Sequence, residues 1–169
     1  MSDRIPPQNL EAEMSVLGAL MLSQDAITRV ADILHSADFY KPSHREIYES
    51  MLELYTRSEP IDIVSMTNRL HEKNALDAVG GSTYLTTLVN SVPTASNVTH
   101  YADIVRRKKT LRDLIDASYH IGELGFNEEG TVEGLLDEAE QKVFQISQRS
   151  LKQKFLKLRD TLEEAWSRL

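Results

Sequence analysis

The sequence predicts an all-α protein with a compact helical head, a long antiparallel helical hairpin and a C-terminal linker helix. Apolar residues recur at intervals of three and four along most of the chain. No segment alternates apolar and polar residues in the way that a half-buried strand requires. Good helix-capping residues stand before periodic segments at Asn9, Asp62 and Thr131. We therefore expect a head over residues 1–96, a hairpin over 97–149 and a linker over 150–169.

The composition is that of an ordinary globular protein. The chain has 169 residues, 41% of them hydrophobic and 27% charged. It has no cysteine, which excludes disulfides and thiolate metal sites. The net charge of −7 argues against attraction of nucleic acid by the whole surface. No apolar run approaches the roughly 18 residues of a membrane helix, so we expect a cytoplasmic protein without a membrane partner.

The first helix of the head should begin after Pro6-Pro7, with Asn9 as its N-cap. Its apolar face is formed by Leu10, Met14, Leu17 and Met21. Gly18 lies inside this helix, where glycine costs about 1 kcal/mol relative to alanine. We interpret Gly18 as the point where a second helix crosses closely.

Further helices complete the head. We expect a second helix over residues 26–34, and Pro42 opens a third over 43–55. Asp62 is the predicted N-cap of a helix over 63–73. Ser82, after Gly80-Gly81, should cap a short helix with Tyr84, Leu85, Leu88 and Val89.

The hairpin is predicted between Asn97 and Ser147, with its turn at residues 125–130. Its first arm of about 28 residues would form a rod of roughly 42 Å. The second arm places apolar residues at spacings of four, three, four and three, which is a heptad seam: Val132, Leu136, Ala139, Val143 and Ile146. Gly125 should end the first arm, and Thr131 should cap the second.

Two arms can cover only one stripe of each other, so apolar surface remains on the hairpin. Such a surface indicates a partner, which is either a second copy of the chain or another protein. For self-association we predict the following residues: Tyr101, Val105, Leu111, Leu136 and Val143.

The charged segment after Ser150 regains a helical apolar stripe. We predict that this linker helix docks on a separate domain through Phe155, Leu158, Leu162 and Trp166. Its abrupt end at Leu169 is the pattern expected of a chain cut before the domain that it contacts.

No catalytic or metal-binding constellation is evident. No two of the five histidines have the i, i+3 or i, i+4 spacing that brings two imidazoles to one helical face. Gly125 and Gly130 have the GxxxxG spacing of a phosphate loop, but Thr131-Val132 replaces its lysine and hydroxyl residue. We predict no catalytic residue, no metal and no cofactor in this chain.

One basic cluster runs through the first arm, over Arg106-Arg107-Lys108-Lys109 with Arg112. Two interpretations stay open. The cluster is a solvated or intersubunit group of charges, or it contacts phosphates.

Several motifs in a fixed order resemble the N-terminal domain of bacterial DnaB-type replicative DNA helicases. The resemblance covers essentially the whole chain. It is carried by the motifs Arg4-Ile5-Pro6-Pro7-Gln8-Asn9-Leu10-Glu11-Ala12-Glu13, Ser15-Val16-Leu17-Gly18-Ala19, Asp38-Phe39-Tyr40, His44-Arg45-Glu46-Ile47-Tyr48, Gly80-Gly81-Ser82-Thr83-Tyr84-Leu85 and Val92-Pro93-Thr94-Ala95-Ser96-Asn97-Val98.

The resemblance implies a non-catalytic collar domain. The family is a hexameric, ATP-driven helicase of DNA replication whose hairpins pair into a trimer of dimers. A linker helix joins this collar to a RecA-like ATPase domain, which binds ATP and Mg and is absent from this chain. DNA would then be a partner only through the parent hexamer, at the replication fork in the nucleoid.

The resemblance also implies that the collar docks the C-terminal domain of a DnaG-type primase. The matching positions are Tyr84, Ile115, Ile121 and Glu11. Each has an alternative interpretation as an ordinary packing or surface residue. A helicase loader is a further partner that the resemblance suggests.

Two other functions remain as alternatives at this point. A single-stranded nucleic-acid-binding module would use Arg106 to Lys109, although only Tyr101 lies near them to stack on a base. A stand-alone helical adaptor, or a loader-like protein, would share only the fold.

Overall fold

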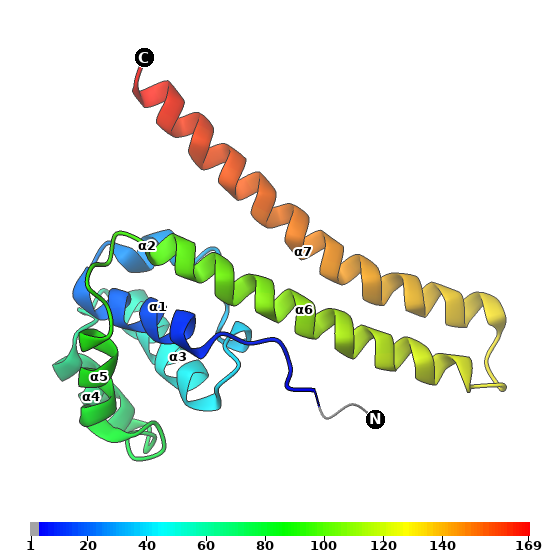
Figure 1. The fold of residues 1–169 in the computed structure, drawn as a ribbon, viewed down its shortest axis with the longest axis horizontal. Coiled ribbons are helices and arrows are strands. Elements are labelled where there is room, and N and C mark those ends of the chain that lie inside the picture. Colours follow the sequence, from blue (N-terminus) through cyan, green and yellow to red (C-terminus); the bar gives the residue numbers. More distant parts are fainter. Residues whose placement is uncertain (1–3) are drawn as a thin grey trace. The chain divides into compact units, whose positions relative to one another are not determined.

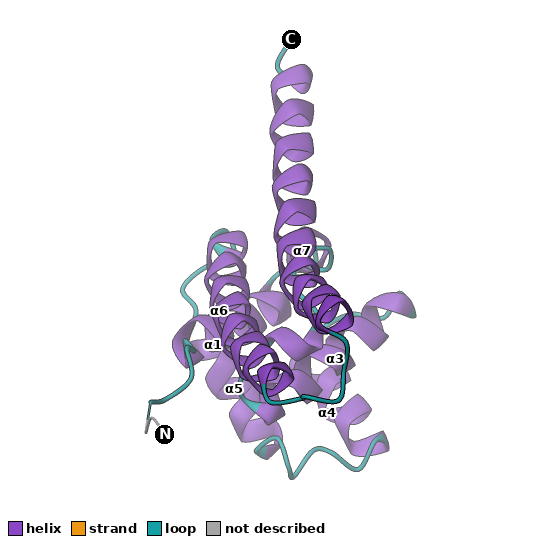
Figure 2. Ribbon diagram, turned by 90° about the vertical axis from the view of Figure 1, so that its right-hand side faces the viewer, coloured by secondary structure: helices purple, strands orange, loops and turns teal. Residues whose placement is uncertain are grey.

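The computed structural model describes residues 4–169, and every regular element among them is helical (Figure 1). The predicted all-α class is thus confirmed, and Figure 2 shows helices and loops alone over the same residues. The chain divides into two units, residues 1–109 and residues 110–169. This division falls inside the first arm of the hairpin, and the predicted three-part organisation stays a prediction.

Over its described residues, 4–109, the first unit contains five α-helices, one 3-10 helix and the start of a sixth α-helix. Their bounds are α1 Leu10–Leu22, α2 Ala26–Val30, η1 Ser36–Asp38, α3 Pro42–Thr56, α4 Ile63–Glu72, α5 Gly81–Asn90 and α6 Val98–Gly125. The expected second helix is too long, because α2 ends at Val30. The backbone N–H groups of Ile33 and Leu34 both bond to the Val30 carbonyl in the turn that follows.

Two of the predicted N-caps are confirmed in this unit. The Asn9 side chain accepts a 2.9 Å hydrogen bond from Ala12 N, and the Asp62 side chain accepts one of 2.7 Å from Ser65 N. Ser82 is not a cap, because α5 begins one residue earlier at Gly81. Gly80 is the N-cap with φ 103°, a left-handed conformation that glycine adopts without strain.

The core of the first unit is mainly apolar. Helix α1 contributes much of it, including Val16, Leu17 and Leu20, which have no exposed surface. Gly18 lies where α1 crosses α5, since a Cβ added there would stand 2.1 Å from the Leu88 carbonyl oxygen. The close crossing predicted from Gly18 is therefore confirmed.

A buried tyrosine links two parts of this core. The hydroxyl of Tyr48 donates a 2.9 Å hydrogen bond to the carbonyl of Leu34. Burial, reinforced by the nearby Asp38 and Asp32 carboxylates, raises the pKa of Tyr48 well above its usual value. The neutral phenol is thus strongly favoured in the fold.

An ion-pair group fastens α3 to α4. Glu53 lies 2.6 Å from Arg69 and 3.1 Å from Lys73, and Lys73 also reaches Glu46 at 2.5 Å. Burial raises the pKa of Glu53, but hydrogen bonds from Lys73 and Arg69 outweigh it and hold this pKa below its usual value. The group links α3 and α4 at the surface, while Leu54, Met66 and Leu70 of the two helices are buried in the core.

The second unit consists of the end of α6, a turn and the long helix α7, Val132–Ser167. The predicted turn is confirmed: α6 ends at Gly125, and the Thr131 hydroxyl caps α7 by accepting a 3.1 Å bond from Gly134 N. Helix α7 is continuous through Ser150, so no helix break separates the hairpin arm from the linker segment.

The half-buried positions of α7 differ from those of the predicted seam. Half-buried residues recur at spacings of four, three and four, at Leu135, Ala139, Lys142 and Ile146. Val132, Leu136 and Val143 are exposed by 67%, 60% and 46%, so contacts within this single chain do not cover these three positions of the predicted seam. Helix α7 carries two apolar stripes side by side, and spacing alone does not tell which one is covered.

Candidate interaction surfaces

On the first unit, Tyr84 is anchored by a buried pair of polar residues. Its hydroxyl lies 2.6 Å from His44 Nε2, and His44 Nδ1 lies 2.8 Å from Glu13 Oε1. The Glu13 carboxylate also accepts a 2.8 Å bond from Tyr40 N. His44 and Glu13 are buried, whereas Tyr84 is half-buried at the edge of α5.

Neither Glu13 nor His44 is among the site residues predicted from the sequence, although both lie within the family motifs. A signal was present. Glu13 precedes Val16 and Leu17 by three and four residues, which places it on the apolar face of its helix. His44 stands in the same relation to Ile47 and Tyr48 on α3. A polar residue on an apolar helical face predicts a buried side chain that needs a hydrogen-bond partner, without saying which partner it has.

Glu11 is the second predicted docking residue of the first unit. It is exposed in the first turn of α1, and its backbone carbonyl accepts a 2.9 Å bond from the Ser15 hydroxyl. Its carboxylate is therefore a surface charge near the positive end of the helix dipole.

The other two predicted docking residues lie on α6 in the second unit. Ile115 is 40% exposed and Ile121 is half-buried. Leu114 and Tyr119 nearby are 48% and 67% exposed. The α6 face of this unit therefore presents a group of large apolar side chains to solvent.

The predicted self-association residues fall into two groups. Leu111 on α6 is 44% exposed, and Leu136 and Val143 on α7 are exposed as well. Tyr101 is half-buried against the core of the first unit, and Val105 is inside that core with 2% exposure. Val105 therefore offers no exposed surface for self-association, since its side of α6 packs against the core of the first unit.

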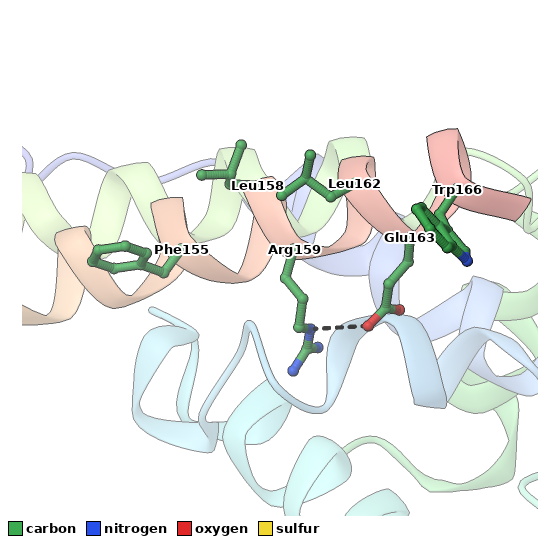
Figure 3. Close-up of a pocket in the computed structure, with 6 residues that line it drawn as sticks. All are labelled: Phe155, Leu158, Arg159, Leu162, Glu163 and Trp166. Atoms are coloured by element: carbon green, nitrogen blue, oxygen red, sulfur yellow. Dashed lines mark ion pairs between the residues drawn. The ribbon is translucent and has the colours of Figure 1, made fainter.

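The predicted linker residues form one exposed stripe on α7. Phe155, Leu158, Leu162 and Trp166 line a shallow apolar groove of about 500 Å³ (Figure 3). Trp166 is 79% exposed. Arg159 Nε and Glu163 Oε1 pair at 3.9 Å on the border of this groove, one helical turn apart.

The basic cluster of α6 does not form one charged surface. Arg106 is 3% exposed and lies 3.8 Å from the Asp38 carboxylate, which has no exposed surface. The interpretation that takes Arg106 to Lys109 together as a phosphate-binding cluster is therefore wrong for Arg106. Its helical position puts it beside Val105 on the buried face of α6.

Residues 4–169 contain neither a cluster of metal-ligating side chains nor a helix that could span a membrane. No group of three or more histidine, aspartate or glutamate side chains within that range is placed to hold a metal ion. None of the helices described there is long and apolar enough to cross a membrane.

Comparison with known proteins gives the family. The model of the DnaB-like helicase N-terminal domain matches residues 5–107. The replicative DNA helicase DnaC of Bacillus subtilis is 43% identical over 169 residues, all of this chain and 37% of that protein. The replicative DNA helicase DnaB of Geobacillus stearothermophilus is 40% identical over 168 residues, 99% of this chain and 37% of that protein.

Solved structures agree with these relatives. The N-terminal domain of DnaB helicase from Mycobacterium tuberculosis superposes with a TM-score of 0.80 at 40% identity, over 83% of this chain and 99% of that one. A DnaB-like replicative helicase, described with its interactions with primase, gives a TM-score of 0.69 at 27% identity, over 82% of this chain and 31% of that one. The chain spans little more than a third of the length of the two helicases compared above, 37%. It belongs to the DnaB-like helicase N-terminal domain family, and it corresponds to the N-terminal part of a replicative DNA helicase.

Proposed function

We propose that this chain is the non-catalytic collar domain of a hexameric replicative helicase, and that it assembles subunits and docks primase. The observation that carries the proposal is the exposed apolar surface of the second unit in a chain of this family. ATP and Mg would be bound by the ATPase domain of the full-length protein. That hexamer would act on DNA in the cytoplasm, at the replication fork in the nucleoid.

Assembly would use the exposed stripe of the hairpin. Leu136 and Val143 lie seven residues apart on α7, and Leu111 lies on α6. Apolar positions at this spacing present one face to another helix, and pairing two copies removes that face from water. Pairs of hairpins would then join as a trimer of dimers.

Docking of the C-terminal domain of a DnaG-type primase would use both units separately. Tyr84 and Glu11 offer a polar and aromatic surface on the first unit, and Ile115 and Ile121 offer an apolar one on the second. Support comes from the 27% identical helicase whose structure is described with its interactions with primase. A helicase loader is the other partner proposed for the collar.

The linker stripe would dock on the ATPase domain of a neighbouring subunit. Phe155, Leu158, Leu162 and Trp166 are each more than half exposed here. Four large apolar side chains on one helical face are the usual anchors of a helix-in-groove contact.

A calorimetric titration with the C-terminal domain of the DnaG-type primase from the same bacterium tests the docking. We expect micromolar or tighter binding, and a loss of more than tenfold (~1.4 kcal/mol) in Tyr84→Ala. Tyr55→Ala is the matched control, because Tyr55 is a 43% exposed tyrosine on α3. Absence of binding by folded wild-type protein would contradict the docking role and leave assembly alone.

A further inference from the structure

A closed chain of hydrogen bonds runs from the interior of the first unit to Tyr84. Glu13 is 1% exposed and His44 has no exposed surface, whereas Tyr84, the last residue of this hydrogen-bond series, is half-buried. The three residues come from α1, α3 and α5, so all three helices must be packed together before both hydrogen bonds can form.

The direction of the hydrogen bond between His44 and Glu13 follows from the other partners of Glu13. Its Oε2 accepts from Tyr40 N at 2.8 Å, and its Oε1 accepts from Lys41 N at 3.4 Å. Because both oxygens act as acceptors, His44 Nδ1 is the nitrogen that donates to Oε1. His44 Nε2 and the Tyr84 hydroxyl form the second hydrogen bond, at 2.6 Å, so one imidazole ring links the buried carboxylate to the tyrosine.

The ring of Tyr84 is held as firmly as its hydroxyl. Its plane lies at 17° to the plane of the His44 imidazole, and the two ring centres are 5.9 Å apart. The Lys41 ammonium lies 4.8 Å from the ring centre. Gly80 packs beneath it, since a Cβ there would stand 2.8 Å from Tyr84 Cβ. The tyrosine therefore has little rotational freedom.

Stability alone is a poor explanation for this chain of bonds. Burying a carboxylate is costly, and well-packed apolar residues often stabilise such a position as well or better. What an apolar replacement cannot do is hold the hydroxyl of the half-buried Tyr84 in one orientation. Glu13 and His44 hold Tyr84 in this way, and Tyr84 is a residue of the proposed primase-docking surface.

We infer that Glu13 and His44 are positioning residues of the primase-docking surface, which they serve by holding the hydroxyl and ring of Tyr84 in one orientation. The inference rests on the proposed docking function. It assigns a role in recognition to two side chains that a partner on the surface does not reach, and it makes the Tyr84 hydroxyl, not only its ring, part of the contact.

A double-mutant cycle tests this inference with the primase C-terminal domain as titrant. Tyr84→Phe removes the hydroxyl and keeps the ring, and we expect binding to weaken by about 2- to 10-fold, as for one hydrogen bond. His44→Leu should weaken binding by a similar factor. The double variant should be no weaker than either single variant, because both changes remove the same interaction.

Conservative and control variants separate positioning from folding. His44→Gln keeps a polar group within reach of the Tyr84 hydroxyl and should recover most of the affinity that His44→Leu loses. His71→Leu is the control, because His71 is an exposed histidine on α4 and should change nothing. Circular dichroism checks that each variant is folded.

A second readout needs no primase. With tyrosine labelled by 13C at Cζ, the Tyr84 resonance should shift in His44→Leu and stay nearer its wild-type position in His44→Gln. Should His44→Leu fail to fold, Glu13→Gln takes its place in both experiments.

The outcomes distinguish the inference from the docking function. Additive losses in the cycle, or full binding by Tyr84→Phe while Tyr84→Ala fails, overturn the positioning role and leave docking intact. Full binding by Tyr84→Ala overturns docking at Tyr84 and the inference with it. An unmoved Tyr84 resonance in His44→Leu overturns the positioning role whatever the binding result.

Discussion

Helices α1 and α7 differ sharply in how they are stabilised. Of the 13 residues of α1, eight are buried, whereas none of the 36 residues of α7 is buried. Most of the stability of a protein helix comes from packing an apolar face, not from helix propensity. The first unit therefore has a buried core that stabilises its helices, whereas α7 has only half-buried and exposed side chains in this chain.

The largest expected effect comes from truncating matched leucines in the two helices. Leu17 of α1 has no exposed surface, and Leu17→Ala should lower the free energy of unfolding of the first unit by about 2–5 kcal/mol. Leu162 of α7 is 60% exposed, and Leu162→Ala should change it by less than about 0.5 kcal/mol. Urea denaturation followed by circular dichroism measures both. Equal losses of unfolding free energy in the two variants would contradict the proposed difference between α1 and α7.

Matched glycines give the next largest difference. At Gly18 the new methyl group would meet the Leu88 carbonyl, so Gly18→Ala should cost about 1–3 kcal/mol or more. At Gly122, inside α6, a Cβ meets nothing within 4 Å, so Gly122→Ala should stabilise the helix by about 0.5–1 kcal/mol. Thermal unfolding of the two variants should move in opposite directions. A loss in Gly122→Ala at high protein concentration would instead indicate close pairing there.

Alkaline pH tests the buried phenol of the first unit. Because the pKa of Tyr48 is raised in the folded state, the phenol contributes full stability below about pH 10, the ordinary tyrosine value, and loses it as the pH rises further. Tyr48→Phe should cost about 1 kcal/mol at neutral pH by losing its hydrogen bond to Leu34, and should flatten the alkaline fall. Urea midpoints at several alkaline pH values measure this. An equally steep fall in Tyr48→Phe would assign it to other groups.

Helix caps give the smallest expected difference. Asp62→Ala removes the cap of α4 and should lower the global stability of the first unit by about 1 kcal/mol. Thr131→Ala removes the cap of α7 and should fray that helix locally without moving the unfolding transition of the first unit. Hydrogen exchange of the first turns compares the two. A shift of the global transition in Thr131→Ala would show that the two units unfold together.

Sequence patterns predicted local structure well, because its causes are local. The caps Asn9, Asp62 and Thr131 each act on an N–H three residues away, so residue type and position suffice to find them. Gly18 was informative because a glycine inside an apolar helix lowers helix stability and usually has a packing reason.

The interaction surfaces were less predictable, because which stripe is covered depends on the whole fold. Leu135 and Leu136 are adjacent and chemically identical, yet one is half-buried and the other is 60% exposed. The pairing of Glu13 with His44 joins residues 31 positions apart, and no local pattern links them. The family resemblance supplied candidate residues, but not the buried pair that holds one of them.

The most direct test of the central claim is sedimentation velocity of this chain over a wide range of protein concentrations. If the exposed apolar stripe of the second unit packs against another copy of the chain, the protein should form dimers or larger assemblies. The double variant Leu136→Glu with Val143→Glu should return these assemblies to monomers. The unfolding transition of the first unit should be unchanged in that variant. A wild-type chain that stays monomeric at high concentration, with α7 fully helical, would contradict the claim.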